Sequence, residues 1–150
     1  MSELRDLYQE TILDHGRSPR HFQVLDDADR TADGYNPLCG DKIKVFLRTK
    51  DGRIEEAAFQ GSGCAISMAA ASLMTHAIRG ASREELEETF RVFQDMVTGK
   101  IDEAAAAARL GKLVVFAGVS KFPVRIKCAT LAWHTARAAM AQIEEPVSTE

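Results

Sequence analysis

The sequence has little of what marks several large classes of protein. No stretch of its 150 residues approaches the roughly 18 uncharged apolar residues of a membrane span, so no such span is expected. Arg and Lys are scattered and the net charge is −3, which gives no support for nucleic-acid binding. The first residues, Met1 to Asp6, lack the charged-then-apolar layout of a signal peptide. These absences lead us to expect neither a membrane nor a nucleic acid as a partner.

Cysteine is also scarce. The three cysteines are an odd number with wide, unequal gaps, so a secreted disulfide framework is not expected and a reducing cytoplasm fits better. The sequence has no Cys-x-x-Cys pair, which leaves a thiol redox enzyme as a weak alternative. Any one of these cysteines alone would more often be a small buried apolar residue than a metal ligand.

The surroundings of the three cysteines point to a metal site instead. Cys39 lies in Tyr35-Asn36-Pro37-Leu38-Cys39-Gly40-Asp41, and Cys64 and Cys128 follow Gly61-Ser62-Gly63 and Arg125-Ile126-Lys127. Cys64 and Cys128 are each expected to open a helix, where the macrodipole favours a thiolate. Three thiolates and a carboxylate match the ligand number of Zn²⁺. We therefore predict a zinc site of Cys39, Asp41, Cys64 and Cys128, with at least one reactive sulfur and with Arg125 and Lys127 offsetting its excess negative charge.

The rest of the chain reads as one domain over residues 1–150. Strands are expected at 43–49 and 54–60, joined by a hairpin turn at Asp51-Gly52, with an edge strand ending near Tyr35. This hairpin starts beside Cys39 and ends just before Cys64, so it should bring those two sulfurs together. The pattern of apolar residues and of helix start and stop signals predicts helices at 3–15, 64–79, 82–97 and from about 125 to 143. A short helix or surface excursion is expected at 100–112, and a frayed tail at 146–150.

Histidine, the other common zinc ligand, is expected to lie outside the site. His15 is interpreted as a helix-end residue and His21 as a loop residue. His76 would lie about three helical turns beyond Cys64, too far to share a metal with it.

The three cysteine segments closely resemble those of the SufU proteins, within the IscU/NifU-N superfamily of iron–sulfur cluster assembly. The matching stretches are 36–41, 61–69 and 122–133, together with the opening from Leu7-Tyr8 to Phe22. Scaffold proteins of the IscU type carry a histidine just before the last cysteine, where this chain has Lys127. Residues 95–115 resemble an insertion typical of SufU. The resemblance implies an α+β fold with a small three-stranded antiparallel sheet covered by helices on one side.

The resemblance also implies a function, a zinc-dependent sulfurtransferase. Zinc would be held by Cys39, Asp41, Cys64 and Cys128. The partner would be a SufS-type cysteine desulfurase, whose histidine takes a zinc position and frees Cys39. Cys39 would then accept the persulfide sulfur, with Arg125 steadying the sulfur anion or the partner, and would pass the sulfur to downstream Suf cluster-assembly proteins. Two alternatives stay open: a scaffold on which a [2Fe–2S] cluster is assembled, and a zinc-stabilised adaptor without enzymatic activity.

Overall fold

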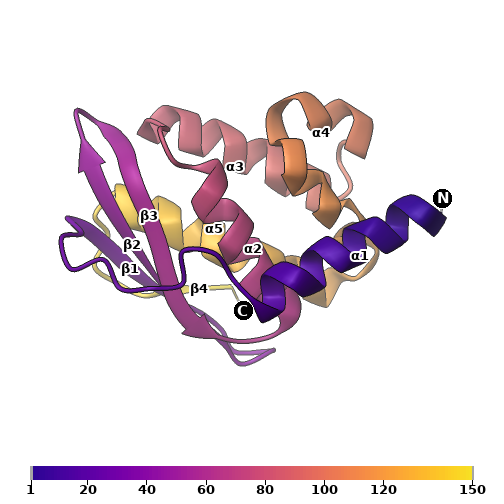
Figure 1. The fold of residues 1–150 in the computed structure, drawn as a ribbon, viewed down its shortest axis with the longest axis horizontal. Coiled ribbons are helices and arrows are strands. Elements are labelled where there is room, and N and C mark those ends of the chain that lie inside the picture. The colour runs from indigo at the N-terminus through magenta and orange to yellow at the C-terminus, as the bar shows by residue number, and fades with distance from the viewer. Residues whose placement is uncertain (1, 150) are drawn as a thin grey trace.

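A computed structural model describes residues 2–149 of the chain, with side chains from residue 8 onward. The fold is α+β, as expected, and begins with a long helix followed by three successive strands (Figure 1). Helices fill the rest of the chain until a short final strand. The elements in chain order are α1 (Ser2–Arg17), β1 (Arg30–Asn36), β2 (Asp41–Lys50), β3 (Arg53–Ser62), α2 (Ala65–Ala77), α3 (Arg83–Val97), α4 (Glu103–Leu110), the 3₁₀ helix η1 (Gly111–Lys121), α5 (Pro123–Met140) and β4 (Val147–Ser148).

The sheet has four strands rather than the three expected, in the order β3-β2-β1-β4. The predicted hairpin is present: β2 pairs with both β1 and β3 in antiparallel fashion. The extra strand comes from residues that we expected to be a frayed tail. They pair in parallel with β1 at Gly34 and Tyr35, and the Thr149 N–H donates to the Tyr35 carbonyl at 3.0 Å. The unpaired outer side of β1 offered backbone groups that this short segment satisfies.

Two helices cover one face of the sheet. Helix α5 packs on β1 and β2, and α2 packs on β3 and on α5. Along β2 the side chains alternate as a half-buried strand requires, with Ile43, Val45 and Leu47 facing the helices. Gly34 allows α5 to approach β1 closely, because a Cβ atom there would collide with the Thr135 hydroxyl. This close approach brings the start of α5 to the end of β1 where the cysteine-containing turn begins.

The remaining helices pack outside this pair, with α3 and α4 on the side away from the strands and α1 against α2 (Figure 1). Trp133 of α5 is fully buried and stacks on Phe93 of α3, with ring centroids 5.3 Å apart. Phe93 in turn meets Phe116 of η1 edge-on. The predicted capping box at Ser82 and Glu85 is present at the start of α3. The aromatic contacts anchor the segment from α3 to η1, which includes the suspected insertion at 95–115, to the core.

One local prediction, a short helix within 100–112, is confirmed, and another needs adjustment. Residues 100–112 include a true helix, α4, which begins at its N-cap Asp102 and buries Ala106 and Leu110. Helix α5 begins at Pro123, earlier than expected, because proline has no N–H to lose at the first helical position. None of the helices within residues 2–149 combines the length and apolar character that crossing a membrane demands.

Candidate metal centre

Cys39 lies in the turn between β1 and β2. The turn spans residues 37–40, and Gly40 closes it with φ of 72°, a left-handed conformation that glycine adopts without strain. The Cys39 N–H donates to the Asn36 carbonyl at 3.3 Å. Asp41 follows as the first residue of β2 and is only 1% exposed. The turn therefore joins a half-buried thiol to a buried carboxylate.

Three of the four predicted ligands come together. The sulfurs of Cys39 and Cys128 and a carboxylate oxygen of Asp41 all lie within 4.8 Å of one another. The Cys128 thiol donates to Cys39 Sγ at 3.3 Å, and all three cysteines are free. Two sulfurs bound to one tetrahedral zinc at 2.3 Å lie about 3.8 Å apart. The two thiols and the carboxylate therefore fit one zinc ion with only small shifts.

Cys128 reaches the site differently from the way the sequence suggested. It was predicted at the mouth of a helix, but α5 starts five residues earlier at Pro123, so Cys128 lies in the second turn and is fully buried. The helix macrodipole is felt mainly in the first turn, so it contributes little to the ionisation of this thiol. Cys128 is instead a candidate ligand buried in the core.

Cys64 was predicted correctly at a helix start, but its sulfur is not among the three clustered ligand atoms. Cys64 is the N-cap of α2, and its Sγ accepts from the Ser67 N–H at 3.4 Å. What it contributes to the cluster is its backbone N–H, which donates to Asp41 Oδ1 at 2.9 Å. The hairpin thus brings Asp41, two residues after Cys39, beside Cys64. Metal binding by Cys64 would compete with its capping contact.

Gly63 makes this contact between Cys64 and Asp41 possible. A Cβ atom on Gly63 would collide with the Asp41 carboxylate, whose Cγ would lie at 3.0 Å. The expectation that the glycines before Cys64 serve a close approach to the site therefore holds at Gly63. Gly61 and Ser62 were not expected within a strand, yet both belong to β3.

The thiols and Arg125 influence one another electrostatically. The neighbouring Cys128 thiol lowers the pKa of Cys64 to about 6, and the Ser67 N–H acts in the same direction against the effect of burial. The pKa of Cys128 is raised by Cys64 and by burial. The pKa of Arg125 is raised chiefly by Cys128, with Cys64 and Cys39 adding to it, so its guanidinium lies where it can balance thiolate charge. Of the two thiols Cys64 and Cys128, the metal-free site therefore favours the thiolate on Cys64.

Asn36 also belongs to the site, although neither its residue type nor its spacing singled it out. It is the last residue of β1 and fully buried, and its register partner across the turn is Asp41. Its side-chain amide donates to Asp41 Oδ2 at 3.1 Å and to Cys128 Sγ at 3.4 Å. The only signal was its place just before Pro37, three residues ahead of Cys39.

The histidines lie elsewhere, as expected. His15 Nδ1 is 2.7 Å from the Ser72 hydroxyl, and His21 Nδ1 is 3.1 Å from the Thr75 hydroxyl. Among the described residues, no histidine joins the cluster of Cys39, Asp41 and Cys128.

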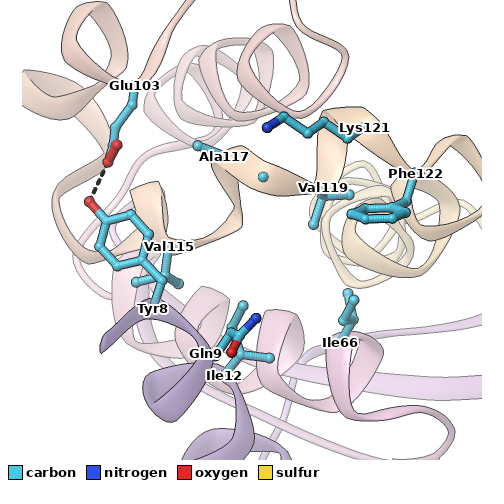
Figure 2. Close-up of a pocket in the computed structure, with 11 residues that line it drawn as sticks. Tyr8, Gln9, Ile12, Ile66, Glu103, Val115, Ala117, Val119, Lys121 and Phe122 are labelled. Atoms are coloured by element: carbon cyan, nitrogen blue, oxygen red, sulfur yellow. Dashed lines mark hydrogen bonds between the residues drawn. The ribbon is translucent and has the colours of Figure 1, made fainter. Parts of the chain in front are cut away.

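A separate groove of about 450 Å³ lies between α1, α4, η1 and the start of α2 (Figure 2). Its lining is mostly apolar, with Tyr8 hydrogen-bonded to Glu103 at one end and Ile66 and Phe122 at the other. The cysteines are not among its lining residues. Ile66 and Phe122 nonetheless stand close in sequence to Cys64 and Arg125, so the groove lies beside the cysteine site.

A fold of this topology with thiols and a carboxylate at one end of its sheet defines a recognisable family. The model of the NifU-like N terminal domain family matches residues 7–129, and the chain belongs to that family. Among its relatives, the zinc-dependent sulfurtransferase SufU of Bacillus subtilis is 42% identical over 143 residues, which cover 95% of each chain. The iron–sulfur cluster assembly scaffold protein IscU of Streptococcus pyogenes is 41% identical and is aligned over 93% of this chain and 86% of its own.

Solved structures agree with this assignment. A SufU protein from Fervidobacterium islandicum superimposes with a TM-score of 0.82 at 29% identity, over 91% of this chain and 98% of its own. The α+β class and the SufU-like character predicted from the sequence are thereby confirmed.

Proposed function

We propose that the protein is a zinc-dependent sulfurtransferase that accepts persulfide sulfur from a SufS-type cysteine desulfurase for iron–sulfur cluster assembly. Cys39, Asp41, Cys64 and Cys128 would hold the zinc, and Arg125 would offset part of the negative charge of the ligands. Bound zinc keeps its cysteine ligands deprotonated at neutral pH and shields them from reaction. The names of the SufU relative and of the family support this proposal, as does the donor set. Free thiols suit a reducing compartment such as the cytoplasm.

One observation carries the choice of Cys39 as the sulfur acceptor: the four ligands are anchored unequally. Each carboxylate oxygen of Asp41 accepts a hydrogen bond from an N–H group. Cys128 Sγ accepts a hydrogen bond from the side-chain amide of Asn36, and Cys64 Sγ accepts one from the Ser67 N–H. Within residues 2–149, Cys39 Sγ has only the Cys128 thiol as a hydrogen-bond partner. Cys39 also stands in a turn, which can move at lower cost than a helix packed into the core. It is therefore the ligand that can leave.

The chemistry is a thiol exchange at constant oxidation state. The Cys39 thiolate attacks the terminal sulfur of a persulfide on the desulfurase, and a new sulfur–sulfur bond forms as the donor's bond breaks. The electron pair leaves on the donor cysteine as a thiolate. Cys39 then carries a persulfide, whose charge Arg125 can balance, and a downstream Suf protein would take the sulfur by the same exchange.

The surface around Cys39 suits the docking of such a partner. Leu38 and Phe122 are each 62% exposed and Val124 is 54% exposed, although all three are large apolar residues. They flank the two thiols, Leu38 beside Cys39 in the turn and the others at the start of α5. Apolar residues of this kind form the energetic centre of many protein interfaces. We propose that the desulfurase covers them when its persulfide reaches Cys39.

Assembly of an iron–sulfur cluster on this site is the second candidate. Relatives that are named scaffold proteins support it, and thiolates bind iron as well as zinc. Lys127 stands where the resemblance places a scaffold histidine. Metal analysis and a visible spectrum of protein purified without air separate the two: zinc with no absorption near 400 nm supports the sulfurtransferase, whereas a stable coloured cluster would favour the scaffold.

The decisive experiment follows sulfur onto the protein. Zinc-loaded protein is mixed with a SufS-type desulfurase and free cysteine without air, and the added sulfur is mapped by mass spectrometry under non-reducing conditions. We expect one extra sulfur on Cys39. Cys39→Ser should accept none, while its circular dichroism spectrum stays that of a folded protein.

Leu38→Ala serves as the matched control, since it changes the same turn and leaves the thiol. It should still receive sulfur on Cys39, at a reduced rate if Leu38 contributes to docking. Sulfur found only on Cys64 or Cys128, or normal desulfurase turnover with Cys39→Ser, would overturn the assignment and favour an adaptor role.

A further inference from the structure

Asn36 is a buried polar side chain whose contacts lie entirely within the candidate metal centre. Its amide group is 0% exposed, and its two donated hydrogen bonds go to Asp41 of β2 and Cys128 of α5. Burying an amide is costly unless it is hydrogen-bonded. The hydrogen bonds that offset the cost of burying Asn36 go to two predicted ligands and to no other side chain of the described residues.

The orientation of the amide shows which of its two ends matters. Asn36 Oδ1 is buried without a hydrogen-bond partner among the described residues. A flipped amide would turn this oxygen toward a carboxylate oxygen and a sulfur, both of which are acceptors when ionised. Both contacts therefore require the NH₂ group. An acceptor left unsatisfied in the core destabilises the fold, so what Asn36 contributes to the site is its two donated hydrogen bonds.

The two donated bonds link three elements of the fold at one point. Asp41 Oδ2 accepts a hydrogen bond from the Asn36 amide and Asp41 Oδ1 accepts one from the Cys64 N–H, so both oxygens of the carboxylate are held in place. The same NH₂ group fixes the Cys128 sulfur relative to that carboxylate. Hydrogen bonds of this kind orient the ligands of a metal and tune its affinity. The Cys39 sulfur receives no hydrogen bond from the Asn36 side chain, although the turn that carries Cys39 follows Asn36 directly.

We propose that Asn36 is a positioning residue of the metal centre: its amide holds Asp41 and Cys128 in zinc-binding positions, so that they retain the metal while Cys39 leaves it. This inference rests on the proposed zinc site. It assigns the retention of zinc during sulfur transfer to a residue that does not itself touch the metal.

The test compares Asn36→Leu and Asn36→Ala with the wild type. Leucine keeps the volume of asparagine and alanine does not, but neither can donate a hydrogen bond. Zinc affinity is measured by competition with a chromophoric chelator, and the ligand geometry is read from the visible spectrum of the cobalt-substituted protein. Both variants should bind zinc about 10- to 100-fold more weakly. Their cobalt d–d bands should shift or broaden, and the zinc should be lost during turnover with the desulfurase.

Thr135→Val is the matched control, because Thr135 is another fully buried polar residue that packs against β1. Its hydroxyl donates to the Leu131 carbonyl at 2.7 Å and contacts no predicted ligand. It should keep wild-type zinc affinity and cobalt spectrum even if its melting temperature falls. Melting temperatures of the zinc-free proteins show how much each change costs the fold alone.

Wild-type zinc affinity and an unchanged cobalt spectrum in either Asn36 variant would overturn the inference. So would zinc affinities that fall only as far as those of Thr135→Val. If the wild type itself binds no zinc, the proposed function fails. If the wild type binds zinc and transfers sulfur but the Asn36 variants do the same, only the positioning role fails.

Discussion

Gly63→Ala should weaken zinc binding although it replaces none of the predicted ligands. The new methyl group would collide with the Asp41 carboxylate, against which Gly63 packs directly. The carboxylate must then move, because the added Cβ is fixed to the backbone and cannot give way. The movement would take Asp41 Oδ1 away from the Cys64 N–H, now 2.9 Å from it.

The size of the effect follows from these contacts. A hydrogen bond to a charged group contributes about 1.5–3 kcal/mol. Disturbing such a contact beside a metal ligand typically weakens binding 10- to 100-fold, which is about 1.4–2.7 kcal/mol. The free energy of the lost hydrogen bond and the expected loss of zinc affinity therefore have about the same size, and both would follow from one displacement of Asp41. We expect zinc affinity to fall within this range.

Gly118→Ala provides the control, since a Cβ atom on Gly118 would meet nothing within 4 Å. Both variants are titrated with zinc against a chromophoric chelator, and their zinc-free forms are melted. Gly118→Ala should bind zinc as the wild type does and gain up to about 1 kcal/mol of stability from the restricted unfolded chain. Equal zinc affinity in Gly63→Ala and Gly118→Ala would refute the reasoning that Asp41 is a ligand held in place from the Gly63 side.

Two further predictions concern Cys64 and His134. Cys64→Ser should lose zinc. The melting temperature of its zinc-free form should stay near that of the wild type, because serine is a good N-cap. Full zinc content by metal analysis would remove Cys64 from the ligand set. Burial, with Arg137 beside it, lowers the pKa of His134 to about 4, so the folded protein holds this ring neutral while the unfolded chain takes up a proton below about pH 6.5. The stability that this neutral ring supports is present above pH 6.5 and is lost as the pH falls toward 4. Urea unfolding of the zinc-free proteins should show that, between pH 7 and 4, the free energy of unfolding falls by roughly 2 kcal/mol more in the wild type than in His134→Gln. This amount is already reduced for the ring's partial contact with solvent. Equal falls in the two proteins would contradict the assignment.

Local patterns predicted much of the fold. The alternation from Ile43 to Leu47 and the turn at Asp51-Gly52 identified the hairpin, and Ser82 with Glu85 identified the start of α3. These features depend on neighbours within a few residues, which the sequence displays directly. The choice of Cys39, Asp41 and Cys128 as partners rested on their residue types and on the family resemblance, and the structure brings these three together.

What the sequence did not reveal depends on contacts between distant segments. Val147 and Ser148 form a strand only because β1 has a free side for them at Gly34 and Tyr35, 113 residues earlier in the chain. The Cys64 sulfur was expected in the cluster, but the N-cap contact with Ser67 competes for it. The role of Asn36 arises from its pairing with Asp41 and from the approach of α5, and neither can be read from the residues around it.

The antiparallel strands β1, β2 and β3 have two outer edges, on β3 and on β1, and each edge is partly covered. This bears on how the protein behaves at high concentration. On the β3 side, Gln23 N–H donates to the Phe59 carbonyl and Phe59 N–H donates to the His21 carbonyl. On the β1 side, β4 occupies Gly34 and Tyr35. Uncovered strand edges are templates for pairing with another chain and hence for aggregation. Truncation before Val147 would uncover the edge of β1 two residues from Pro37, so such a variant would invite edge-to-edge association next to the turn that carries Cys39.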